Sequence, residues 1–152
     1  MIDLMPLNFI YKISTIDLKL VYTESGGVRI EVGALPLKSI DNEKCVNIEI
    51  IFSIVAEVKC VTVNFDEFNY NDFSISEESS IGNHLENDEE RLHHPDSGFY
   101  EVIDSKHLQE NIKKYDPRNR FNLKHYIVKG YDSYIEIIAS TYSVNELDWF
   151  VL

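Results

Sequence analysis

Residues 14–32, STIDLKLVYTESGGVRIEV, contain the clearest signal for the fold. Apolar and polar side chains alternate imperfectly up to Tyr22, and the alternation resumes at Val28. Ser25-Gly26-Gly27 lies between the two halves, and glycine supplies the positive φ that tight hairpin turns need. This pattern predicts an antiparallel β-hairpin.

Three more segments have the composition of β-strands. Residues 46–65 are rich in β-branched side chains, which predicts one long bent strand or two shorter strands separated at Ala56-Glu57. Residues 122–128 and 131–140 predict a second hairpin, joined by a two-residue turn at Lys129-Gly130. These patterns make β-sheet the dominant expected structure of the chain.

The second hairpin has two unequal faces, since successive side chains on a strand point to opposite sides. The face predicted to join the core carries Tyr126, Val128, Tyr131, Ser133, Ile135 and Ile137. The opposite face carries Leu123, His125, Ile127, Asp132, Tyr134, Glu136 and Ile138. We therefore expect His125 to lie beside a carboxylate, either Asp132 or Glu136.

One segment, residues 104–115, has the pattern of a helix. Asp104 is the expected N-cap, and Ile103 and Leu108 are then placed as a hydrophobic staple. Pro117 disfavours helical geometry at the residue before it, which ends the helix. The predicted fold class is therefore α+β, mainly β, in a single domain of 152 residues: antiparallel sheet with one main helix at about 104–115 and a long acidic loop at about 66–103.

The charge of the chain is concentrated in residues 66–104. That segment holds twelve acidic residues and one basic residue, so its net charge is −11. The whole chain carries −12, so everything outside the segment is almost neutral. An acidic surface attracts basic partners and repels nucleic acid, whose binding depends on Lys and Arg at the phosphates. We therefore expect a basic protein partner and no nucleic acid.

Three aromatic residues lie at the entrance to this acidic segment, and aromatic anchors beside charge are typical of protein interfaces. The predicted partner-binding residues are Asp66, Glu67, Phe68, Tyr70, Asp72, Phe73, Glu77, Glu78, Glu86, Asp88, Glu89, Glu90 and Asp96. The N-terminal residues lack the features of a signal peptide, and no apolar run is long enough to cross a bilayer. We expect a cytoplasmic protein without membrane contact.

Catalytic and cofactor signals are weak, so we expect no enzyme activity, no cofactor and no metal. The phosphate-binding and nucleophile-elbow motifs are missing from the sequence. His93-His94-Pro95-Asp96 has metal-ligand residue types, but adjacent histidines on a strand point to opposite faces. His125 with Asp132 or Glu136 supports the alternative of a small enzyme or a small-ligand-binding β domain, because a carboxylate would orient the imidazole as a base.

Two other features have simple structural explanations. Cys45 and Cys60 lie in apolar runs without a C-x-x-C spacing, so we expect two buried thiols. The segment 116–120, DPRNR, is a turn with two arginines, which we expect to be a solvated loop or to pair with the acidic segment, with anion binding as the alternative.

In size, charge and strand content the chain resembles the immunity proteins of bacterial polymorphic-toxin and contact-dependent-inhibition systems. Residues 115–140, YDPRNRFNLKHYIVKGYDSYIEIIAS, are also similar to a block in small uncharacterised bacterial proteins. The first resemblance implies an inhibitor that covers a toxin domain, commonly a basic nuclease. The acids of residues 66–104 would then occupy its cationic groove, with Phe68, Tyr70 or Phe73 as the anchor. A structural or assembly protein that binds further copies of itself is the second alternative.

Overall fold

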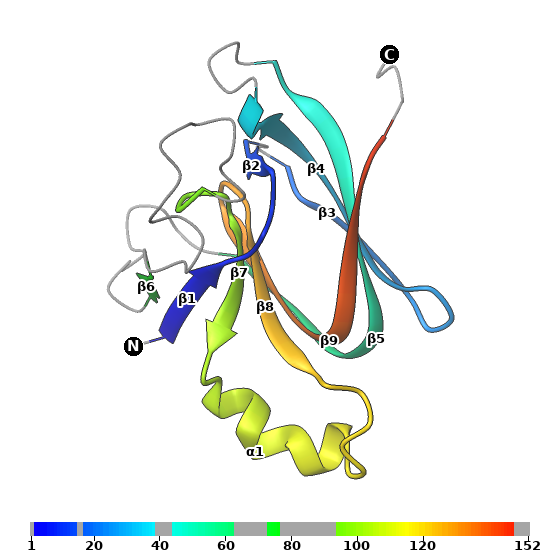
Figure 1. Cartoon of the computed structure of the whole chain (residues 1–152). Helices are drawn as coiled ribbons and strands as arrows, with labels where there is room; N and C mark the ends of the chain where they lie inside the picture. The colour runs from blue at the N-terminus through cyan, green and yellow to red at the C-terminus, as the bar shows by residue number, and fades with distance from the viewer. Residues whose placement is uncertain (1, 15–16, 39–43, 63–72, 77–93, 148–152) are drawn as a thin grey trace.

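The computed structural model describes all residues except 1, 15–16, 39–43, 63–72, 77–93 and 148–152. Within these described residues, nine strands form one sheet, and one helix, α1 (Lys106–Tyr115), follows the seventh strand (Figure 1). The strands are β1 (Ile2–Pro6), β2 (Tyr11–Ile13), β3 (Lys19–Thr23), β4 (Gly27–Pro36), β5 (Val46–Thr62), β6 (Phe73–Ile75), β7 (Phe99–Ile103), β8 (Lys124–Lys129) and β9 (Ser133–Glu146). The mainly β, α+β fold class is confirmed.

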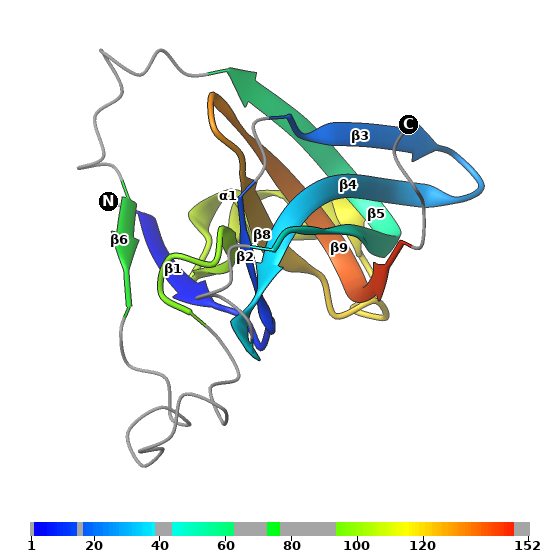
Figure 2. The same cartoon turned by 90° about the horizontal axis from the view of Figure 1, so that it is seen from above.

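The sheet follows the order β2-β4-β5-β9-β8-β7-β1-β6, and β3 pairs with the first half of β4. All neighbouring strands are antiparallel except β1 and β6, which are parallel. The sheet is curled, and the N-terminal chain bridges its two ends (Figures 1 and 2). The backbone N–H groups of Leu7 and Ile13 donate to the carbonyl oxygens of Phe99 and Ser97, at 3.3 and 2.8 Å. The curl is therefore held closed by the same chain that forms β1 and β2.

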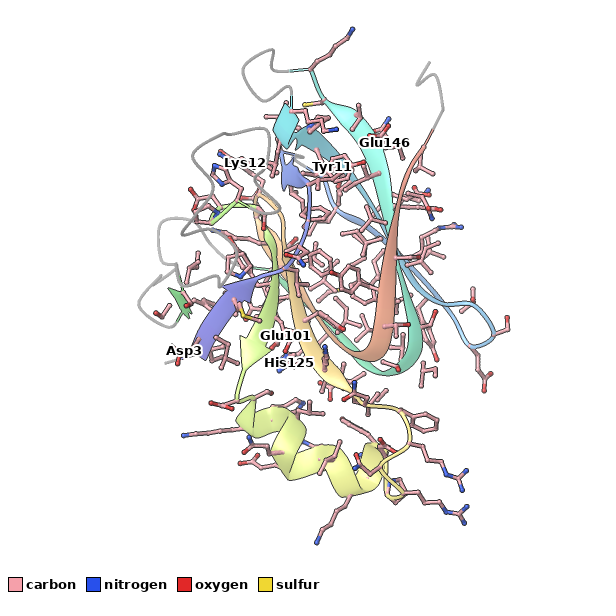
Figure 3. All side chains as sticks on the ribbon, in the orientation of Figure 1. Asp3, Tyr11, Lys12, Glu101, His125 and Glu146 are labelled. Atoms are coloured by element: carbon pink, nitrogen blue, oxygen red, sulfur yellow. The ribbon has the colours of Figure 1, made fainter. Side chains whose placement is uncertain are left out.

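The larger core cluster fills the inside of the curl, where aromatic side chains pack edge to face. Phe52 on β5 and Phe9 each contact the Phe99 ring, with ring centroids 5.9 and 5.2 Å apart. Tyr11 and Glu146 join β2 to β9 by a hydrogen bond of 2.8 Å (Figure 3). A smaller cluster lies on the other side of β7 and β8, and it consists of Leu4, Tyr100, Val102 and Ile127.

The first predicted hairpin is confirmed as β3 and β4. Thr23 pairs with Gly27, so residues 24–26 form the connection. Gly27 has φ +74, and a Cβ there would collide with the main-chain oxygen of Phe52 on β5. Glycine is required at this position by both the turn and the close approach of the neighbouring strand.

The second predicted hairpin is confirmed as β8 and β9, with a longer connection than expected. Lys129 pairs with Tyr134, and the connection runs over Gly130–Asp132, outside both strands. Tyr131 is therefore 58% exposed and does not belong to the core face. The other apolar members of that face, Tyr126, Val128, Ile135 and Ile137, are buried as predicted.

Residues 46–62 form one bent strand, β5, with an irregularity near the predicted break. The pairing with β9 shifts between Val55 and Glu57, and Ile54 has φ +56. A positive φ in a β-branched residue is an outlier that costs about 1–3 kcal/mol. This bulge increases the local twist, which fits the curl of the sheet.

Helix α1 begins later than predicted. Its N-cap is Ser105, whose side chain accepts from the N–H of Leu108, and Asp104 lies in the preceding turn with φ +49. The staple of Ile103 and Leu108 is therefore wrong, because it depended on Asp104 as the cap. The helix ends before Pro117 as predicted. No helix in the described ranges has the length and apolar character needed to cross a membrane.

Two further expectations are wrong. The predicted loop at 66–103 contains β6 and β7, because Phe99, Tyr100 and Val102 find buried positions despite the acidic residues around them. Cys45 and Cys60 are both exposed and free. Cys45 precedes β5, and Cys60 lies in the part of β5 that pairs only with β9, so neither thiol is covered.

Candidate functional site

The predicted partner-binding surface falls mostly on residues outside the described part of the chain. Only Phe73 and Asp96 of the thirteen predicted residues are described. The Phe73 ring is half-buried on β6 and meets Tyr134 on β9 edge to face, with centroids 5.7 Å apart. Asp96 is exposed in the turn before β7, where its N–H donates to Nδ1 of His94 at 3.0 Å. Phe73 therefore packs on the sheet, whereas Asp96 faces solvent.

Two strands within the acidic segment, β6 and β7, lie on either side of β1 (Figure 2). On one side, β6 runs parallel to β1, and the N–H of Ser76 donates to the carbonyl of Leu4 at 2.8 Å. On the other side, β7 runs antiparallel to β1, and the hydroxyl of Tyr100 donates to the carbonyl of Pro95 at 2.8 Å. In the sequence, six acids and one base lie between Ser76 and His94.

A polar cluster, here called the His125 cluster, lies where β8, β9 and the start of α1 meet (Figure 3). His125 on β8 is only 4% exposed. Its Nδ1 lies 2.7 Å from Oγ of Ser105, and its Nε2 lies 3.0 Å from Oε1 of Glu136. The strand register explains the second contact, because His125 pairs with Ile138 and Glu136 is its diagonal neighbour on the same face.

A second set of contacts joins α1 to β5 beside this cluster. Both carboxylate oxygens of Glu57 contact Nε2 of His107, at 2.8 and 3.0 Å. The hydroxyl of Tyr115, at the other end of α1, also donates to Glu57. The rings of His107 and His125 are 6.0 Å apart, so the two sets form one polar region.

Both carboxylates in this region hold their charge more strongly than usual. The hydrogen bond with His125 lowers the pKa of Glu136, and this effect outweighs the opposing effect of burial. Burial acts to raise the pKa of Glu57, but the hydrogen bonds from Tyr115 and His107 outweigh it and lower the pKa overall. The positive charge of Lys59, 3.7 Å from Glu136, also lowers the pKa of Glu136.

The residues of the His125 cluster have little exposed surface, and their contacts join β8, β9 and the start of α1. Ser105 is 8% exposed, and its Oγ already accepts from the N–H of Leu108 at 3.1 Å. Both ring nitrogens of His125 are engaged, one by Ser105 and one by Glu136, and the ring itself is only 4% exposed. No residue of α1 is fully buried, and these polar contacts join the helix to the sheet.

Among the described residues, no group of three or more His, Cys, Asp or Glu side chains is placed to hold a metal ion. His94, from the sequence cluster with metal-ligand residue types, uses Nδ1 within its own turn.

Sequence reasoning found part of the His125 cluster. Glu136 is the carboxylate that contacts His125, whereas Asp132 is exposed in the turn between β8 and β9. Ser105 was missed, although a serine three residues before Leu108 is a common N-cap signal. Glu57 was also missed, and it had no local signal because it lies 58 positions from Tyr115 in the sequence.

Comparison with known proteins gave no match: no protein-family model, no curated protein and no solved structure is significantly similar to the chain. The function therefore has to be argued from the charge and geometry of the chain itself.

Proposed function

We propose that this chain is an acidic binding protein that neutralises or caps a basic partner protein, as an immunity protein does with a basic nuclease-type toxin domain. One observation carries this proposal: residues 66–104 hold −11 of the total charge of −12. A function limited to solubility would be served by charge spread over the whole surface. Concentrated charge creates a local field that accelerates association with an oppositely charged protein by a factor of about 10–10³.

Two strands that lie near the most acidic stretch in the sequence support the proposal. β6 precedes residues 77–93 and β7 follows them, and both strands pair with β1. The described residues on either side of this stretch therefore include strands of the main sheet.

The test compares two variants with the same net charge, −8. The first neutralises part of the acidic segment: Glu86→Gln, Asp88→Asn, Glu89→Gln and Glu90→Gln. The control neutralises four exposed acids elsewhere: Asp3→Asn, Glu24→Gln, Glu110→Gln and Asp132→Asn. The probe is the basic protein encoded beside the gene of this chain. The first readout is the rate at which the probe associates with each variant, at low and high salt. The second is the survival of cells that express the probe together with each variant.

We expect the first variant to lower the association rate by about tenfold at low salt, because it removes charge where the partner docks. The control should change the rate by less than about twofold, since its charges are spread over the sheet, the helix and two turns. Raising the salt concentration should weaken the wild-type complex most. Equal association rates for the two variants would show that the position of the charge is irrelevant, and the proposal would be wrong.

A further inference from the structure

The loop after α1 is built as a rigid element by one buried carboxylate. Asp116 is 4% exposed, and its two oxygens accept from the N–H groups of Arg120 and Phe121, at 2.8 and 3.0 Å. Its carbonyl accepts from the N–H of Asn119 at 3.1 Å. The far end is fixed by Ser140, whose hydroxyl donates to the carbonyl of Phe121 at 2.5 Å. A solvated loop of eight residues, 116–123, does not require this internal order.

The hydrogen-bonded loop after α1 exposes cationic and aromatic side chains to solvent. Arg118 and Arg120 are exposed, and Phe121 is 38% exposed. Lys113 and Lys114 are exposed in the last turn of α1, next to the loop. Within the described ranges, neither arginine forms an ion pair. We call residues 113–121 the cationic loop.

The charge here is opposite to that of the rest of the molecule. Residues 104–124 hold six of the fourteen basic residues and only three acids, so their net charge is +3 and the remaining residues carry −15. One of the three acids, Asp116, points inward and is used by the loop backbone. The outer surface of α1 and its loop is therefore basic, at the lower end of the molecule in Figure 1.

We propose that the cationic loop is a docking surface for a short acidic segment of a partner protein, with Arg118 and Arg120 binding its carboxylates and Phe121 contacting an apolar side chain beside them. Arginine and aromatic residues are the types that dominate binding energy at protein interfaces. The guanidinium group binds a carboxylate through two parallel hydrogen bonds. A rigid loop loses little freedom on binding, which favours affinity.

The short length of the proposed acidic segment distinguishes it from larger polyanions such as RNA or a membrane. At physiological salt, charges farther away than about 8 Å are largely screened, so a short acidic segment interacts with the loop and little else. An RNA chain or an anionic membrane extends beyond the loop, and it would meet the acidic remainder of the protein. This surface is distinct from the acidic segment that carries the proposed function, so either proposal can fail without the other.

The test measures binding of a fluorescein-labelled peptide of eight glutamates with one central tryptophan, by fluorescence anisotropy at physiological salt, where the Debye length is about 8 Å. The double variant Arg118→Gln/Arg120→Gln should raise the Kd by about tenfold or more. Arg118→Lys/Arg120→Lys keeps the charge but loses the bidentate geometry, so we expect a rise of at least about threefold. The matched control, Lys38→Gln/Lys44→Gln, changes two exposed bases far from the loop in sequence and should alter the Kd by less than about twofold.

Three results would overturn the proposal. The wild-type protein could fail to bind the peptide, or the lysine control could weaken binding as much as the arginine variants do. A uridine oligonucleotide or phosphatidylserine vesicles could also bind more tightly than the peptide, which would assign the surface to RNA or to a membrane. Circular dichroism melts of each variant separate a binding effect from a folding defect, and both arginine side chains are exposed, so we expect unchanged melting temperatures.

Discussion

Replacing Glu136 by glutamine tests whether the His125 cluster contributes to stability through charge. Glutamine keeps an oxygen that accepts from Nε2 of His125, so the change removes the negative charge and little volume. A hydrogen bond to a charged group contributes about 1.5–3 kcal/mol and a neutral one about 0.5–1.5 kcal/mol. Lys59, 3.7 Å away, is 60% exposed and adds little. We therefore expect a loss of about 1–1.5 kcal/mol at pH 7, which corresponds to a lower Tm by about 2–6 °C for a chain of this size.

The difference in stability between the wild type and Glu136→Gln should depend on pH in a defined direction. The folded-state pKa of Glu136 is lowered from its ordinary value of 4.5, so its contribution is present above that value and is lost as the pH falls through the folded-state pKa. The difference in Tm between the wild type and Glu136→Gln should be full at pH 7 and shrink below about pH 4.5. Thermal melts followed by far-ultraviolet circular dichroism between pH 3 and 7 measure it.

Asp132→Asn is the control for this experiment, because Asp132 lies in the turn that follows β8 but is exposed. Its effect should stay within about 0.5 kcal/mol at every pH, as for most surface substitutions. The reasoning is refuted if Glu136→Gln leaves the Tm at pH 7 unchanged. It is also refuted if the loss is as large at pH 3 as at pH 7, because the charge of the carboxylate would then not be its cause.

Three further predictions concern the fold around the site. Gly27→Ala should lower the free energy of unfolding by more than about 2 kcal/mol, since Gly27 combines a positive φ with a close main-chain contact. At Gly26 an added Cβ meets only the side chain of Thr23, so Gly26→Ala should cost about 1 kcal/mol. Denaturant unfolding measures both values. Ser105→Ala removes both the N-cap of α1 and a partner of the buried imidazole, so we expect a loss of about 1–3 kcal/mol and reduced helix content. Cys45 and Cys60 should both react with a thiol reagent in the folded protein, and a native protein that gave fewer than two equivalents would contradict their exposure.

The elements that the sequence predicts best are those whose signals are local. The β3–β4 hairpin follows from alternation around two glycines, and the end of α1 follows from Pro117. β1 and β7 were not predicted, because they are stabilised by pairing with each other across about 95 residues. In β7, the stretch FYEVI was also obscured by the acidic residues before it, although three of its five side chains are buried.

The same limit applies to the candidate site. The contact between His125 and Glu136 could be expected, since a hairpin fixes which residues of two adjacent strands share a face. The other two residues of this polar region are Ser105, which precedes α1 and contacts His125, and Glu57 on β5, which contacts His107. Only the curl of the sheet and the position of the helix bring them together, and neither property is encoded in a short pattern.

The central place of β9 has a consequence for how the protein is made. In the sheet, β9 lies between β5 and β8, so it joins β2–β5 on one side to β6, β7, β1 and β8 on the other. On a ribosome, strands β2–β5 can pair among themselves, but the edge of β5 stays unpaired until residues 133–146, about 80 positions later, have been added. Contacts between such distant positions form slowly. We therefore expect the nascent chain to remain open, with its aromatic core accessible to chaperones, until β9 has been synthesised.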